Sequence, residues 1–95
     1  MKFIFIGKYF RDLLRDAIKF NDNAFLSFNG KDLVLETENG FSVRSELVES
    51  VDGDAVKTTF KKELNKAELL TELKEAKSVL IELTNQSIAI KSLTY

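Results

Sequence analysis

The segment AFLSFNGKDLVLET, residues 24–37, carries the clearest structural signal in the chain. Two apolar, strand-forming runs, Ala24–Phe28 and Asp32–Thr37, stand on either side of Asn29-Gly30. Asn-Gly favours a tight hairpin turn because both residues tolerate the positive φ angles that such a turn needs. The segment therefore predicts two antiparallel strands joined by a short turn.

Upstream of this hairpin, the chain predicts a strand and then an amphipathic helix. The strand covers Lys2–Ile6, and the helix covers Lys8–Phe20 and ends before the polar run Asn21-Asp22-Asn23. Apolar residues recur in the helix at the spacing that places them on one side, which we expect to be buried. They are Phe10, Leu13, Leu14, Ala17 and Ile18.

Downstream of the hairpin, Asn39-Gly40 marks a second turn of the same type. It leads into an alternating segment, Phe41 to about Val48, which predicts a third strand of the hairpin sheet. Asp52-Gly53-Asp54 then predicts a polar turn. Its two carboxylates supply too few oxygens at fixed spacing for a divalent cation, so a plain turn is the preferred interpretation.

The second half of the chain has a similar order of elements. A strand from Ala55 to about Leu64 precedes a helix over Lys66–Ala76, with Asn65 as N-cap and Glu68 completing a capping-box pattern. The helix is expected to bury Leu69, Leu70, Leu73 and Ala76. The remaining elements are two strands, Val79–Leu83 and Ser87–Leu93, with a turn at Asn85-Gln86.

One ungapped offset of 55 residues aligns the two halves. Apolar positions agree in the strand, the helix and the hairpin at once, which indicates a repeat. The aligned pairs are Phe5/Phe60, Leu14/Leu69, Ile18/Leu73, Leu26/Ile81, Phe28/Leu83, Leu33/Ile88 and Leu35/Ile90. We therefore predict that Leu14 and Leu69 occupy equivalent buried positions. The same offset leaves repeat 2 without a counterpart of the third hairpin strand.

These observations predict a single α+β domain over residues 1–95, with two helices packed on antiparallel sheets. It consists of a duplicated β-α-β-β unit, with repeat 1 at about 1–50 and repeat 2 at about 55–95. Hydrophobic residues make up 44% of the chain and charged residues 31%, as expected for one domain with a modest core.

Composition also restricts the class of protein. The chain contains no Cys, which favours a reducing, cytoplasmic environment, and no apolar run near the ~20 residues of a membrane span. It contains no His, no phosphate-binding loop and no nucleophile motif. We therefore expect a protein that is not an enzyme and that uses no metal or cofactor.

The pattern resembles one domain of the DNA sliding clamps, the family of the bacterial beta clamp, proliferating cell nuclear antigen and the checkpoint clamp. The resemblance rests on MKFIFIGKYFRDLLRDAIKF, LSFNGKDLVLETENGFSVRSELV and FKKELNKAELLTELKEAKSVLIELTNQSIAIKSL. It implies helices that line a central hole around duplex DNA, sheets that form the outer wall, and neighbours joined by edge strands. The chain differs in having one domain instead of two or three, and in lacking one edge strand.

The first predicted helix carries a basic stripe, which consists of Lys8, Arg11, Arg15 and Lys19. Spacings of three and four residues place these side chains on one face, opposite the apolar one. By the resemblance, this face would contact DNA phosphates without reading bases. A solvated helix face and a protein contact are the alternative interpretations, and the neighbouring Asp12 and Asp16 reduce the positive potential.

The second predicted helix carries an acidic cluster, which consists of Glu68, Glu72 and Glu75. This cluster weakens the DNA interpretation, since a clamp would be expected to present two basic helices. It is a candidate protein-binding site that could pair with the basic stripe of another protomer or dock a charged partner. A solvated face is the alternative.

The last predicted strand supplies the other candidate protein-binding residues, Ile88 and Ile90. We expect it to lie at a sheet edge that has one Lys and no Pro to protect it. The chain is therefore predicted to self-associate, or to bind a partner, by strand addition there or at the 41–48 edge. The competing outcome is a monomer in which Val48–Val56 folds back over the edge.

Two functions from different classes follow. The first is a clamp-related processivity or scaffold factor of DNA replication or repair, which binds duplex DNA or forms a homo-oligomer. The second is a small phage or mobile-element protein that uses a clamp-like fold to inhibit or modulate a host replication or defence complex. Fold resemblance alone does not choose between them.

Overall fold

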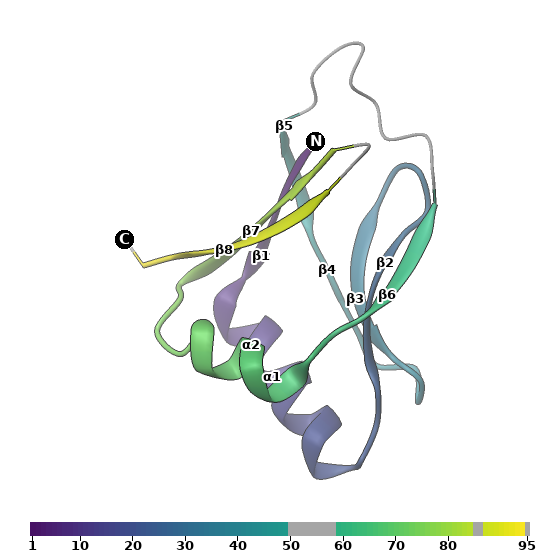
Figure 1. The fold of residues 1–95 in the computed structure, drawn as a ribbon, viewed down its shortest axis with the longest axis vertical. Coiled ribbons are helices and arrows are strands. Elements are labelled where there is room, and N and C mark those ends of the chain that lie inside the picture. Colours follow the sequence, from purple (N-terminus) through teal and green to yellow (C-terminus); the bar gives the residue numbers. More distant parts are fainter. Residues whose placement is uncertain (50–58, 85–86, 95) are drawn as a thin grey trace.

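Figure 1 shows the computed structural model, which describes residues 1–49, 59–84 and 87–94. The first half contains β1 (Lys2–Ile6), α1 (Gly7–Lys19), β2 (Ala24–Phe28), β3 (Leu33–Thr37), β4 (Ser42–Arg44) and β5 (Glu46–Glu49). The second half contains β6 (Phe60–Glu63), α2 (Lys66–Glu72), β7 (Ser78–Leu83) and β8 (Ile88–Leu93). The predicted turns at 52–54 and 85–86 and the start of the long strand predicted from Ala55 lie outside the described residues.

The strands form two antiparallel four-stranded sheets, which confirms the α+β class. Their strand orders are β5-β1-β7-β8 and β4-β3-β2-β6. Each sheet joins the first strand of one half to the hairpin of the other half. In Figure 1 the two helices lie together at one end of the molecule and the two sheets extend from them.

The core lies between the sheets and the helices and is rich in phenylalanine. Phe3 of β1 and Phe28 of β2 meet edge to face across the two sheets, with ring centroids 6.0 Å apart. Phe5 of β1 meets Phe10 of α1 in the same way at 5.1 Å. All four side chains are fully buried. Each buried aromatic ring contributes about 2 kcal/mol from removal of apolar surface from water, so these contacts stabilise the arrangement of both sheets and α1.

Helix α1 buries four of its five predicted core residues, and Ile18 is the exception. Ile18 is 46% exposed, whereas Phe10, Leu13, Leu14 and Ala17 are buried. At 100° per residue, Ile18 lies about 90° from the centre of the buried face. The apolar pattern was therefore correct, but the buried face is narrower than the apolar one.

The predicted third strand of the hairpin sheet is wrong as a single element. Residues 42–44 form β4 beside β3, and residues 46–49 form β5 beside β1 in the other sheet. The register that pairs Val34 with Arg44 leaves β3 no residue to pair beyond Ser45, because β3 begins at Leu33. Ser45 marks the crossing: its hydroxyl and its N–H both donate to the Leu33 carbonyl, at 2.7 and 3.3 Å.

Strand register shows that the 55-residue offset holds for the hairpins only. Under that offset, the observed pair Phe3–Ile81 would correspond to Leu26 paired with residue 58. Leu26 instead pairs with Lys62, four residues further along the chain. The first strands and helices of the two halves therefore correspond at an offset of 59, and the connection from helix to hairpin is four residues longer in the first half.

Helix positions agree with this corrected offset of 59. Helix α1 begins at Gly7 and α2 at Lys66. The corresponding buried pairs are Phe10/Leu69, Leu14/Leu73 and Ala17/Ala76. Leu14 and Leu69 are both buried, as predicted, but they are not equivalent. Ala76 follows the end of α2, which stops at Glu72 and not at the predicted Ala76, and its N–H donates to the Leu73 carbonyl at 3.1 Å.

Truncation of the paired core leucines tests this arrangement. Leu14→Ala and Leu73→Ala are each expected to lower the free energy of unfolding by about 2–5 kcal/mol, because both side chains are almost fully buried. Ile18→Ala is the matched control and should cost less than about 1 kcal/mol. Urea denaturation followed by circular dichroism measures all three, and equal costs would contradict the described packing.

Candidate functional site

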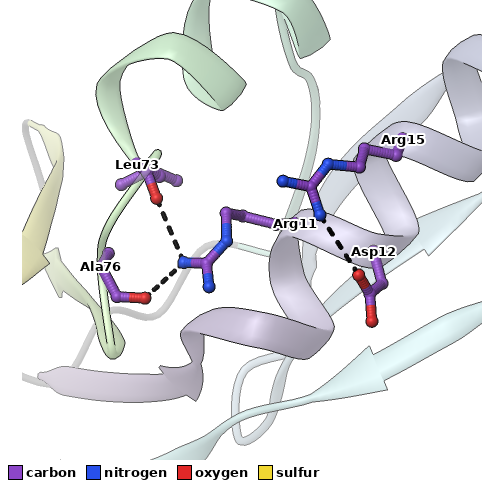
Figure 2. Close-up of polar contacts among 5 residues, drawn as sticks. All are labelled: Arg11, Asp12, Arg15, Leu73 and Ala76. Atoms are coloured by element: carbon purple, nitrogen blue, oxygen red, sulfur yellow. Dashed lines mark hydrogen bonds and ion pairs between the residues drawn. The ribbon is translucent and has the colours of Figure 1, made fainter.

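Arg11, a member of the basic stripe, binds the end of the other helix. Its Nη1 donates to the Leu73 carbonyl oxygen at 3.1 Å and also to the Ala76 carbonyl oxygen (Figure 2). Carbonyl groups at a helix C-terminus lack intrahelical partners and carry a partial negative charge, so a guanidinium is well suited to them. Arg11 is half-buried, and the Nη1 group of its guanidinium contributes to the contact between the helices.

Gly7 completes the same junction from the start of α1. Its N–H donates to the Lys77 carbonyl oxygen at 2.9 Å. A Cβ at this position would overlap the Ala76 carbonyl oxygen, so only glycine allows this close approach of the two backbones. We call Gly7 and Arg11, together with the turn Leu73–Lys77, the helix junction.

The other three residues of the basic stripe are exposed. Nη1 of Arg15 lies 3.4 Å from Oδ1 of Asp12 (Figure 2). Both side chains are about half exposed, so this ion pair adds little stability. The ammonium of Lys19 lies 5.5 Å from the ring centroid of Phe20. Lys8 is exposed near the start of α1. The stripe thus presents three cations to solvent, one of them beside a carboxylate.

The acidic cluster of Glu68, Glu72 and Glu75 is exposed, and within the described residues it forms no ion pair. Asn65 caps α2 as predicted, because its side chain accepts from the Glu68 N–H at 3.2 Å. The exposed side of the helix layer therefore carries cations on α1 and carboxylates on α2 and the turn that follows it.

Strand β8 lies at an edge of its sheet, as predicted. Val48 and Glu49, the described residues of the Val48–Val56 segment that was expected to cover it, belong to β5, which pairs with β1 at the opposite edge of that sheet. This part of the competing prediction is wrong, and residues 50–56 lie outside the described part of the chain. Lys91 makes an ion pair with Glu82 of β7 at 3.2 Å.

The backbone of β8 offers hydrogen-bonding groups on its outer side. The Thr84 N–H donates to the Ser87 carbonyl at 3.0 Å, which makes this opposed pair hydrogen-bonded. Hydrogen-bonded pairs alternate along an antiparallel ladder, so the N–H groups of Ile88, Ile90 and Ser92 point away from β7. The side chains of Ile88 and Ile90 are half-buried against the core. At the outer side of the sheet edge, these two candidate residues thus present their backbone and not their side chains.

Sequence reasoning missed a pocket beside α1, between the end of that helix and the β3–β4 turn. Its volume is about 210 Å³. Phe20 and Phe41 line it although they are 59% and 61% exposed. In the sequence, a polar turn follows Phe20 and another precedes Phe41. A large aromatic residue beside a polar turn is the sequence pattern that could have indicated this pocket.

Within residues 1–49, 59–84 and 87–94, no group of three or more acidic side chains is placed to hold a metal ion. Asp52 and Asp54 lie outside those ranges. No helix in the described part of the chain is long and apolar enough to cross a membrane.

No family model, curated protein or solved structure matches this chain. The resemblance to sliding clamps therefore stays a prediction.

Replacing Arg11 distinguishes its role from that of its neighbours in the basic stripe. Arg11→Met keeps the aliphatic stem but leaves two carbonyl groups of the helix junction without this donor, so it should destabilise the protein by about 1–3 kcal/mol. Arg15→Met removes the same charge from an exposed position and should change stability by less than about 0.5 kcal/mol. Thermal and urea unfolding measure both, and equal stabilities would contradict a structural role for Arg11.

Proposed function

We propose that this chain is a non-catalytic protein-binding module with a clamp-like arrangement of two β-α-β-β units. The repeated order of elements in the two halves, with two helices and two antiparallel sheets, supports the clamp-like description. The function rests on one observation above all: among the described residues, β8 pairs with β7 alone and has outward N–H groups at Ile88, Ile90 and Ser92. An edge of this kind binds an added strand through main-chain hydrogen bonds.

Association of two copies through β8 is the simplest form of this activity. Two β8 strands related by a two-fold axis are antiparallel, so each copy offers the same surface to the other. The joined sheets would form one continuous sheet across the dimer. In a cell, the same edge would accept a strand of a replication, repair or defence protein, as proposed for a phage or mobile-element protein that modulates a host complex.

The charged faces also support protein binding over DNA binding. Arg11 is engaged in the helix junction, Arg15 lies beside Asp12, and the acidic cluster on and after α2 repels phosphate. Opposite charges on the two helices favour encounter with a partner of complementary charge and fix its orientation.

A proline at Ser92 tests strand addition at β8. Ser92→Pro removes an outward N–H and leaves the hydrogen bonds between β8 and β7 intact. Proline is tolerated in a sheet at such edge positions, where the N–H faces solvent. We expect the wild type to associate at tens of micromolar in sedimentation velocity and Ser92→Pro to remain monomeric. Ser92→Ala is the matched control and should associate like the wild type.

Circular dichroism must show that Ser92→Pro is folded. A wild type that is monomeric at every concentration, or a Ser92→Pro variant that associates normally, would contradict binding through this edge. Ala89→Pro is a less suitable test, because the Ala89 N–H faces β7 and its loss would weaken the domain itself.

Duplex DNA binding is the second candidate, and the exposed Lys8, Arg15 and Lys19 on one helix favour it. If these cations contact three phosphates, the logarithm of the association constant should fall with the logarithm of salt concentration with a slope of about −3. Changing all three residues to Glu should abolish binding in a fluorescence-anisotropy titration with a labelled duplex. Arg11 is left unchanged because it holds the helix junction.

The control for this charge reversal changes three exposed basic residues outside the helices and the helix junction, Lys31, Arg44 and Lys62, to Glu. It alters net charge by the same amount, so a similar loss of binding would show a general charge effect and not an interface on α1. Absence of binding by the wild type at low salt would exclude this function and leave the protein-binding proposal unaffected.

A further inference from the structure

The pocket beside α1 has an apolar floor, an aromatic rim and an acidic side. Leu13 and Ala17 of α1 and Val43 of β4 supply apolar lining, and Phe20 and Phe41 are the exposed aromatics. Asp12 and Asp16 add carboxylates from the helix. The volume of about 210 Å³ is below the roughly 300–1,000 Å³ of sites for drug-sized ligands and cofactors. It suits a single side chain of a partner.

Backbone hydrogen bonds hold Phe20 in place at the end of α1. The Asn21 N–H donates to the Ile18 carbonyl at 3.2 Å, and the Asp22 N–H donates to the Ala17 carbonyl at 2.7 Å. Asn21 has a φ of 52°, as expected for the left-handed residue of a Schellman motif. One wall of the pocket is therefore a well-defined helix end.

The β3–β4 turn holds Phe41 on the other wall. Thr37 accepts from the Phe41 N–H through Oγ1 at 3.2 Å, and the Thr37 N–H donates to the Phe41 carbonyl at 2.9 Å. Both bonds fix the backbone from which the Phe41 ring projects. The Phe41 side chain itself is exposed.

Asp22 ties the two walls together. Its side chain is 5% exposed; Oδ1 accepts from the Asn23 N–H at 2.9 Å, and Oδ2 accepts from the Asn39 N–H in the β3–β4 turn at 3.3 Å. The carboxylate of Asp22 is therefore committed to the fold. The backbone of both walls is therefore held by hydrogen bonds within the chain, which lowers the entropic cost of ordering it on binding.

The free negative charge of the pocket comes from Asp16. Within the described residues Asp16 forms no ion pair, whereas Asp12 shares its charge with Arg15 at 3.4 Å. Asp12 and Asp16 are four residues apart on α1 and so lie on the same face of the helix. A cation that enters the pocket would meet both carboxylates together with the exposed ring of Phe41, whereas the Phe20 ring already has the Lys19 ammonium 5.5 Å from its centroid.

We propose that this pocket binds the side chain of an arginine from a partner protein. A guanidinium stacks on aromatic rings and donates paired hydrogen bonds to carboxylates, and its three-carbon stem suits the apolar floor. Arginine and aromatic residues are also the side chains that dominate binding energy at protein interfaces. The proposal is independent of strand addition at β8, which belongs to the other sheet.

Titration with short peptides, followed by ¹H–¹⁵N nuclear magnetic resonance, tests the proposal. The probe is acetyl-Leu-Arg-Leu-amide, and we expect saturable shifts of the backbone amides of Ala17, Phe20, Phe41 and Val43. The citrulline peptide has the same shape without the charge and should bind at least about tenfold more weakly. The lysine peptide should also bind more weakly, because an ammonium cannot stack or donate in pairs.

Two variants with matched controls locate the binding groups. Asp16→Asn should weaken the arginine peptide about tenfold by removing the free charge, whereas Asp32→Asn, an exposed carboxylate in the β2–β3 turn, should not. Phe41→Ala should weaken binding severalfold, whereas Tyr9→Ala, a similarly exposed aromatic outside the pocket, should have no effect. All four changes are at exposed side chains, so the variants should fold.

Any of three results would overturn the proposal. These are amide shifts that avoid the pocket or fail to saturate, equal binding of the arginine, lysine and citrulline peptides, and an affinity unchanged by Asp16→Asn. Ser92→Pro should bind the arginine peptide like the wild type. Failure of strand addition at β8 and failure of this pocket are thus distinguishable.

Discussion

The helix junction is the contact on which the rest of the structure depends. Gly7 brings the start of α1 against the turn that follows α2, and Arg11 binds the carbonyls at that turn. Lys77, whose carbonyl accepts from the Gly7 N–H, also donates its own N–H to Leu93 of β8 at 2.8 Å. The junction therefore connects both helices to one sheet, and the close approach of the backbones leaves no space for a side chain at Gly7.

Exchange of first strands makes the two halves interdependent. Strand β1 is completed by the hairpin of the second half, and β6 by the hairpin of the first, so neither half has a closed core alone. Most of the stabilising contacts thus join residues far apart in sequence, and we expect one cooperative unfolding transition. The exchange also produces two four-stranded sheets, and β8 lies at an edge of one of them.

The charged groups that are available at the surface are those that the fold does not use in its own hydrogen bonds. Arg11 and Asp22 are charged residues that the fold uses internally: one joins the helices and the other joins α1 to the β3–β4 turn. Among the described residues, the groups still available to a partner include the outward backbone of β8, the carboxylate of Asp16 beside exposed phenylalanines, and two helix faces of opposite charge. On these features rests the proposal that the chain binds a protein, with strand addition for affinity and charged groups for orientation.

Local sequence determined the kind of element almost everywhere, because hairpin turns and apolar periodicity depend on neighbouring residues: Asn29-Gly30 and the apolar face of α1 are examples. Tertiary structure alone decided the rest. Four residues are nearly one helical turn and also preserve strand alternation, so the true offset of 59 and the apparent offset of 55 look alike in sequence. Likewise, only the end of β3 opposite Ser45 shows where the third strand must leave its sheet. Arg11 looked like its neighbours in the basic stripe, because the carbonyl groups it binds lie more than sixty residues away in the chain.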